Sequence, residues 1–307
     1  MRDATSELFP TGRRKCTGES HQALRSLQRE GVDASGIPAA DSPEQEALEA
    51  AVFYRVCKMG GLSAHPLGIM KVSPEPERLT VRLLDEPYVV RHWAERLLPQ
   101  QADELTGDRD PRDCIHGVPG LRSRVGAGGV ALYRPGTSAQ VLLTGFNTRW
   151  WERITALLNG SRPQLFTNTA WAPLERAAHV AGHKSELEES LIGSAILRRI
   201  RATAGPGEIN STDAWSCGAE GLRLETTDGP PCPELIRSLC ERPWGLGWRV
   251  EHAWCTCRQP VPEGCTIDFR LPTGQQRVYY SNLHWGRTSD ERRQATVREL
   301  NQSAFAV

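Results

Sequence analysis

The sequence predicts an α+β fold with a helical N-terminal portion, a mixed central portion with a β-hairpin, and a small C-terminal α+β unit with a three-stranded meander. Apolar residues recur at helical spacing in the first part of the chain. Between residues 62 and 204, strand-like and helix-like runs alternate irregularly and include a hairpin, which argues against a doubly wound parallel sheet. Residues 246–283 carry three strand-like runs in succession, as a meander would.

The domain boundaries are expected where this pattern changes. The stretch 202–213 (ATAGPGEINSTD) is rich in turn-forming residues, so we expect a linker there. We therefore predict an N-terminal arm and short helix over residues 1–40, a main α+β domain over 41–204, and a C-terminal α+β domain over 205–307.

Two helices are expected before the first strand. The first covers residues 18–31 and ends at a glycine of the kind that follows helices. The second covers residues 42–61, where Ser42 is the expected N-cap and Pro43 the first helical residue.

The central elements follow from alternation, periodicity and turn residues. The runs lie at residues 65–74 and 77–85 (strands), 89–107 (helix), 129–145 (hairpin), and 147–160 (helix). A further helical run covers residues 172–207. We expect it to break after Gly182, because Ser185 and Glu188 have the spacing of a new capping box.

Composition excludes several classes of function. Lys plus Arg and Asp plus Glu number 37 each, so no overall field attracts nucleic acid or anionic lipid. No apolar run approaches the roughly 18 residues of a membrane helix, so no membrane partner is predicted. Nine cysteines are an odd number in a long chain without a secretory signal pattern, which favours a cytoplasmic location and free thiols.

The cysteines near the C-terminus are the first candidate site. Cys255 and Cys257 are two residues apart, so in a strand they share one face, while His252 points to the other. Zinc knuckles more often carry two or four intervening residues between their cysteines. We therefore favour cysteines that pack as small apolar residues, and we predict no cofactor.

Zinc is the alternative that these cysteines leave open. Cys255 and Cys257 with Cys265 would supply three thiolates, and either Cys217 or Cys232 would supply the fourth.

A second candidate metal site lies in the long helical run. On an unbroken helix His179, His183 and Glu186 would share one face, as two histidines do in zinc hydrolases. Val180 replaces the catalytic glutamate of that motif, and the expected break would separate the two histidines. We therefore expect no metal there.

Two further groups are candidate contact residues. Arg13, Arg14 and Lys15 form the densest basic run, ahead of the first expected helix, where a flexible arm could contact DNA phosphates. Trp150 and Trp151 are adjacent on a helix, so only one can face the core squarely and the other could lie on a partner surface.

Residues 17–28 (TGESHQALRSLQ) resemble a phrase found in uncharacterised bacterial proteins of GC-rich actinobacteria and of their plasmids and phages. The resemblance implies an origin and no activity. The function we favour is a cytoplasmic binding or regulatory protein, such as an accessory protein of a mobile element that acts on DNA or on a protein partner. The alternative is a metal-dependent enzyme whose site lies near His179, His183 and Glu186 or at the C-terminal cysteines.

Overall fold

The computed structural model describes most of the 307-residue chain. The described residues are 4–57, 63–102, 110–161, 163–205, 211–217, 221–257, 259, 263–272, 276–284, 298, 299 and 302, with only the backbone described for 4–10, 161 and 183–190.

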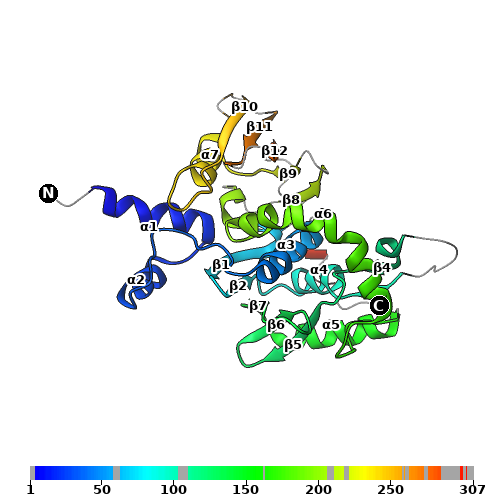
Figure 1. Ribbon diagram of the computed structural model, residues 1–307. Coiled ribbons are helices and arrows are strands. Elements are labelled where there is room, and N and C mark those ends of the chain that lie inside the picture. The colour runs from blue at the N-terminus through cyan, green and yellow to red at the C-terminus, as the bar shows by residue number, and fades with distance from the viewer. Residues whose placement is uncertain are drawn as a thin grey trace.

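Two five-stranded mixed sheets form the framework (Figure 1). The central sheet has the order β1-β2-β7-β6-β5, with β1 Ile69–Glu75, β2 Arg78–Leu83, β5 Arg122–Gly126, β6 Gly129–Tyr133 and β7 Gln140–Thr144. The C-terminal sheet has the order β10-β11-β12-β9-β8, with β8 Ser211–Ser216, β9 Gly221–Thr227, β10 Arg249–Cys255, β11 Gly264–Arg270 and β12 Arg277–Leu283. Among the strands of the described residues, only β2 with β7 and β12 with β9 pair in parallel. A small hairpin sheet pairs β3 Gln100–Gln101 with β4 Ile115–His116.

The helices lie around and between these sheets. The α-helices are α1 Ala4–Thr17, α2 His21–Arg29, α3 Pro43–Cys57, α4 Pro87–Leu97, α5 Thr148–Ser161, α6 Pro173–Leu197 and α7 Cys232–Cys240, and the short 3-10 helices are η1 Pro66–Gly68, η2 Pro111–Cys114 and η3 Ile200–Thr203. In Figure 1, α1 and α2 lie at one side, α7 lies with the C-terminal sheet at the top, and α3 and α6 run between that sheet and the central one.

The predicted α+β class is confirmed, and several elements agree closely with the sequence. The hairpin expected over residues 129–145 is the antiparallel pair β6 and β7. The meander is β10, β11 and β12, but the sheet continues into β9 and β8 and is larger than predicted. The first expected helix is α2, where the Ser20 hydroxyl accepts a hydrogen bond from the Ala23 backbone N–H.

Two predictions, for the N-terminal arm and for one helix of the central portion, are corrected. The N-terminal arm is itself a helix, α1, and it includes the basic run. The helix expected over residues 89–107 ends at Leu97, because Leu98 is extended ahead of Pro99, as residues before proline prefer. The C-terminal residues 285–297 lie outside the described part of the chain.

The predicted break in the long helix is wrong. α6 runs from Pro173 to Leu197 without interruption through Gly182. It packs along α3 so closely that a Cβ on Gly193 would lie 3.0 Å from the Ala50 Cβ atom. Burial of this helix face against α3 offsets the roughly 1 kcal/mol that a glycine costs within a helix.

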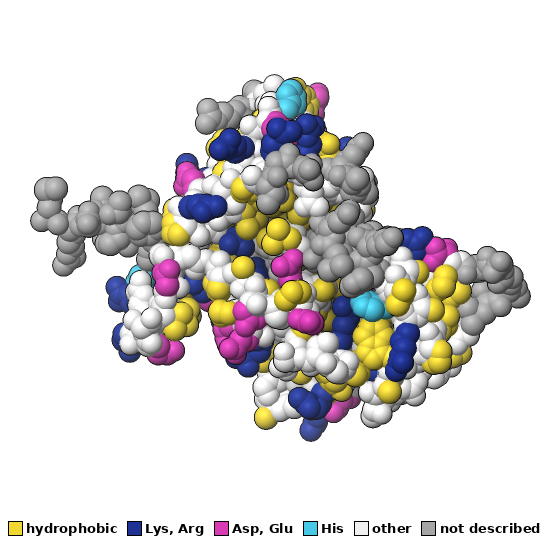
Figure 2. Space-filling model, viewed as in Figure 1, with side chains coloured by type: hydrophobic (Ala, Val, Ile, Leu, Met, Phe, Trp, Pro, Cys, Tyr) yellow, Lys and Arg dark blue, Asp and Glu magenta, His cyan; other side chains and the backbone are white. Residues whose placement is uncertain are grey.

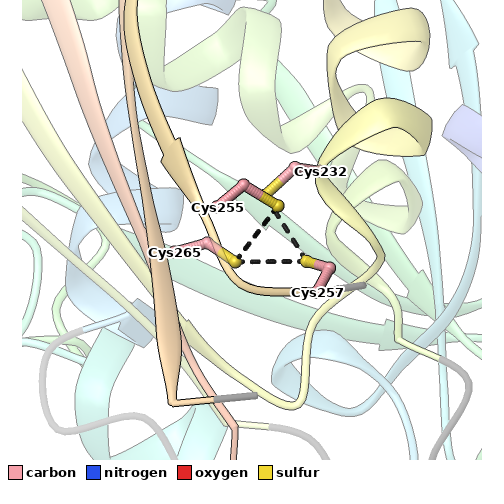
Figure 3. A group of neighbouring side chains, drawn as sticks. All are labelled: Cys232, Cys255, Cys257 and Cys265. Atoms are coloured by element: carbon pink, nitrogen blue, oxygen red, sulfur yellow. Dashed lines mark hydrogen bonds between the residues drawn. The ribbon is translucent and has the colours of Figure 1, made fainter. Parts of the chain in front are cut away.

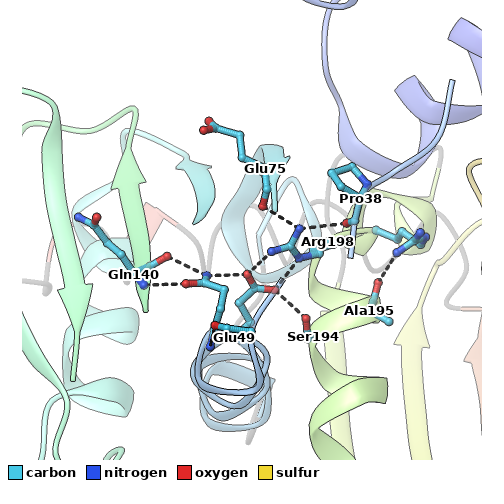
Figure 4. Close-up of polar contacts among 10 residues, drawn as sticks. Pro38, Glu49, Glu75, Gln140, Ser194, Ala195 and Arg198 are labelled. Carbon is cyan, nitrogen blue, oxygen red and sulfur yellow. Dashed lines mark hydrogen bonds and ion pairs between the residues drawn. The ribbon is translucent and has the colours of Figure 1, made fainter. Parts of the chain in front are cut away.

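A buried ion pair joins five segments of the molecule near the central sheet (Figure 4). Arg198, at the end of α6, donates two hydrogen bonds to the Glu49 carboxylate of α3, from Nε at 2.7 Å and from Nη2 at 2.6 Å. Its Nη1 atom donates to the backbone carbonyls of Pro38 and Glu75, both at 3.0 Å. We call this group the Arg198–Glu49 hub.

Glutamine and serine complete the Arg198–Glu49 hub. Gln45 donates to Glu49 at 2.7 Å and exchanges two hydrogen bonds with the Gln140 backbone at the start of β7. Ser194 donates to the other Glu49 oxygen at 2.7 Å. Arg198 and Glu49 are fully buried, so their opposite charges compensate each other inside the protein.

Charges of both signs are scattered over the face that Figure 2 shows, in keeping with the balanced composition. Within the described residues, no helix is both long enough and apolar enough to span a lipid bilayer.

Candidate metal centre

The β10–β11 hairpin brings three cysteines together at its tip. Cys255, the last residue of β10, lies directly opposite Cys265 of β11. Cys257 lies in the turn, which the Thr256 side chain holds: its hydroxyl donates to the Gly264 carbonyl and accepts from the backbone N–H groups of Glu263 and Gly264. Because the strand ends at Cys255, the turn redirects Cys257 toward the same point as Cys255 and Cys265.

The fourth cysteine comes from a helix. Cys232 is the first residue of α7, which follows Pro230 and Pro231, and it faces the tip of the hairpin (Figure 3). α7 is amphipathic, and its buried Leu235 and Leu239 dock it against the core, which places Cys232 beside the hairpin.

The four sulfur atoms lie close enough together to hold one metal ion. All lie within 4.8 Å of one another. Individual Sγ–Sγ distances are 3.6 Å for Cys232–Cys257, 3.1 Å for Cys257–Cys265 and 3.6 Å for Cys255–Cys265. Sulfurs bound at about 2.3 Å around one zinc ion would be about 3.8 Å apart. A disulfide would need about 2.05 Å, so the cysteines are free thiols.

Burial differs among the four thiols. Cys232 and Cys265 are buried, Cys257 is half-buried and Cys255 is exposed. Burial raises the pKa of Cys232, and it raises the pKa of Cys257 to about 11. Burial also acts to raise the pKa of Cys255, but the Cys257 backbone N–H and the neighbouring thiols stabilise its thiolate, so the net shift is downward. The site is therefore accessible from the Cys255 side, where an ion could enter.

A histidine borders the cluster. The Nε2 atom of His284, just after β12, lies 3.5 Å from Cys265 Sγ and 3.7 Å from Cys257 Sγ. From there its N–H can donate to a thiolate, the kind of supporting contact that surrounds metal ligands in proteins. The sequence interpretation missed His284, because no spacing motif links it to the cysteines.

The expected opposition of His252 to Cys255 is confirmed. His252 pairs with Asp268 and Cys255 pairs with Cys265, so their side chains lie on opposite faces of the sheet. The sequence left open whether Cys217 or Cys232 is the fourth cysteine of the group, and the structure places Cys232 there. Cys217 follows β8, which lies at the other edge of the sheet from β10.

The second candidate metal site, where we predict no metal, is described only in part. His179 lies on the continuous helix α6, and its ring centroid is 5.1 Å from that of Trp171. The side chains of His183 and Glu186 lie outside the described residues, so the prediction that no metal binds there stays a prediction.

The basic run is not a free arm. Arg13 is buried, where its Nε atom donates to the Glu19 carboxylate at 2.7 Å, and it cannot reach a DNA phosphate in this conformation. Lys15 is exposed but contacts Glu234 of α7 at 2.9 Å. Arg14 is exposed at the end of α1. If the basic run contacts DNA phosphates, which stays a prediction, the contact could therefore involve Arg14 and Lys15 but not Arg13.

The tryptophan pair divides as expected from helical geometry. Trp151 is 1% exposed and donates a hydrogen bond to the Ser123 hydroxyl, so it belongs to the core. Trp150 is half-buried and packs against the same core from the outside. A partner surface, still a prediction, could involve Trp150 alone.

Comparison of the chain with models of protein families, with curated proteins and with solved structures gives no match.

Proposed function

We propose that the protein binds one zinc ion through Cys232, Cys255, Cys257 and Cys265, and that the ion is structural. The observation that carries this proposal is the convergence of four sulfurs from a helix, a strand, a turn and a second strand within 4.8 Å. Four thiolates in a tetrahedral arrangement select zinc or iron among the common metals.

The ligand set favours a structural rather than a catalytic role. Structural zinc sites use four protein ligands, whereas catalytic sites keep one position open for water or substrate. With four cysteines available the coordination sphere is full. This supports the class of function favoured by the sequence, a binding or regulatory protein, over a metal-dependent enzyme.

Packing of thiols as small apolar residues explains other cysteines better than these four. Cys16 and Cys57 are fully buried among apolar side chains, and burial raises the pKa of Cys16 to about 12. Such thiols stay protonated and inert. Cys255, in contrast, is exposed, yet its sulfur lies near three other sulfurs.

The ion would fasten α7 to the β10–β11 hairpin. β10 is an edge strand whose seven residues are all exposed, so packing holds it weakly. A thiolate–metal link from Cys255 and Cys257 to Cys232 would anchor this strand to the helix. A reducing compartment would keep the ligands as thiols, in agreement with the cytoplasmic location that the composition favours.

Elemental analysis of the purified protein tests the proposal. We expect one zinc per chain, and intense d–d absorption typical of tetrahedral thiolate sites after replacement by Co2+. Cys257→Ser and Cys265→Ser should each lose most of the bound metal. Cys217→Ser and Cys240→Ser, two half-buried cysteines outside the cluster, are matched controls and should retain it.

Three results would contradict the proposal. One is zinc content unchanged in Cys257→Ser and Cys265→Ser, and another is equal loss in the control variants. The third is a protein that takes up no zinc or cobalt after reduction and refolding in excess metal.

A further inference from the structure

A pocket that is distinct from the cysteine cluster lies between the end of α1, η3 and the first turn of α7. Its volume is about 360 Å3, within the range of small-molecule sites. Its charged lining residues are Arg14, Lys15, Arg201 and Glu234, and we call it the basic pocket.

The basic pocket gathers positive charge in a chain that has none overall. Three cations and one carboxylate line it, which leaves a formal charge of +2 against a net charge of zero for the whole protein. Lys15 and Glu234 contact each other at 2.9 Å and are both about half exposed, so Arg14 and Arg201 supply the uncompensated charge. Cations near a helix C-terminus are favourable in themselves. That explains Arg14 and Lys15 at the end of the 14-residue helix α1. Arg201 lies in the last turn of η3, which has four residues and therefore a much smaller dipole.

Arg201 is the residue that points to a ligand. Its Nε atom is buried and, among the described residues, has no hydrogen-bond partner. Its Nη1 atom makes only a long contact, 3.3 Å, with the Ile69 carbonyl. Burial also lowers the pKa of this guanidinium, which means that its charged form is poorly solvated. A buried donor without an acceptor costs about 1–3 kcal/mol, so the Arg201 guanidinium is poorly compensated by the protein. Because Arg201 lines the pocket, an anion bound there would offset its charge.

The backbone around the basic pocket is shaped by glycine. Gly18 ends α1 with φ +75°, and a Cβ there would lie 2.6 Å from the Met70 carbonyl and 3.3 Å from Arg201 Cγ. Glycine at this position therefore allows the Arg201 side chain to pass close to the end of α1 and reach the same pocket as Arg14.

We propose that the basic pocket binds a phosphate-bearing anion between Arg14 and Arg201. Arginine is suited to this because its planar group donates two parallel hydrogen bonds to phosphate oxygens. No aromatic side chain is among the residues that line the pocket, so recognition would rest on the phosphate and not on stacking of a base. The proposal is independent of the metal centre, although α7 contributes to both.

Calorimetric titration with inorganic pyrophosphate at about 50 mM salt tests the site. We expect one site per chain. Arg14→Gln and Arg201→Gln should each weaken binding about tenfold, which corresponds to ~1.4 kcal/mol. Glu234→Gln should strengthen it, because that substitution removes the one negative charge among the described residues that line the pocket. Arg25→Gln, on the exposed face of α2, is the matched control and should leave binding unchanged.

Arg14 and Glu234 are exposed, so their substitution should not prevent folding. Because Arg14→Gln should lower the affinity and Glu234→Gln should raise it, the test remains decisive even if Arg201→Gln fails to fold. The proposal is overturned if pyrophosphate does not bind, or if both variants keep the affinity of the native protein within twofold. Competition with AMP and with duplex DNA identifies the source of the phosphate. Displacement of pyrophosphate by AMP alone indicates a small ligand, and displacement by DNA with a loss in Arg14→Gln indicates a DNA phosphate.

Discussion

The Arg198–Glu49 hub and the cysteine cluster are two polar groups that hold distant segments of the chain together, and they differ in their chemistry. The hub places a cation and an anion together, and the partners of both are supplied by the protein itself (Figure 4). The cluster places four groups of the same kind together, and as thiolates they would repel one another (Figure 3). The hub is complete as folded, whereas the cluster would, on the function proposed above, be completed by an external cation.

The location of each group fits this difference. The hub is fully buried beside the central sheet, where only a compensated pair of charges is tolerable. The cluster lies at the tip of an edge hairpin, with Cys255 exposed, where an ion can enter and leave. The stability of the central region should therefore depend on the chain alone, and that of the C-terminal sheet on the metal.

The largest effect is expected from breaking the hub. Arg198→Met removes the cation and leaves Glu49 buried without compensation, which should destabilise the protein by about 3–5 kcal/mol in urea denaturation. Because the hub contains no metal ligand, zinc should not restore this loss. A loss below about 1 kcal/mol would show that the hub contributes little.

Removal of the metal should have the next largest effect, confined to the C-terminal sheet. With free zinc held at about a hundred to a thousand times its dissociation constant, binding stabilises the folded state by about 2.7–4.1 kcal/mol. After chelation, amide hydrogen exchange should therefore accelerate in β10, β11 and α7, while α3 and α6 remain protected. Equal acceleration in both regions would contradict the division between them.

A smaller effect is expected from the histidine beside the cluster. His284→Ala removes a contact to Cys257 and Cys265 and should weaken zinc binding about 10- to 100-fold, measured by competition with a chromogenic chelator. His252→Ala is the matched control, since that side chain lies on the opposite face of the sheet. If both variants bind zinc alike, His284 does not support the site.

The smallest effect is expected at a solvent-exposed ion pair. Arg237 of α7 and Glu241, the C-cap residue of that helix, lie 3.8 Å apart and are more than half exposed. Arg237→Met should change the free energy of unfolding by less than about 1 kcal/mol in the same urea experiment. A loss as large as that of Arg198→Met would mean that burial is not what distinguishes the hub.

Local sequence signals predicted most of the elements and part of the site. Alternating apolar residues around a turn identified the hairpin β6–β7, and apolar spacing with the glycine at residue 31 identified α2. Strand alternation also placed His252 opposite Cys255. The predicted helix break was wrong, because packing of α6 along α3 outweighs the local capping signal at Ser185.

The sequence by itself determined the fold class and the positions of most strands and helices, because these depend on periodicity and turn residues a few positions apart. Only the tertiary structure decided which cysteines meet. The turn after Cys255 redirects Cys257, and docking of α7 selects Cys232 over Cys217. The basic pocket also needed the fold, since Arg14 and Arg201 are far apart in the chain and meet only where α1 ends against η3. Convergence of this kind is set by packing between elements, which leaves no spacing signal in the chain.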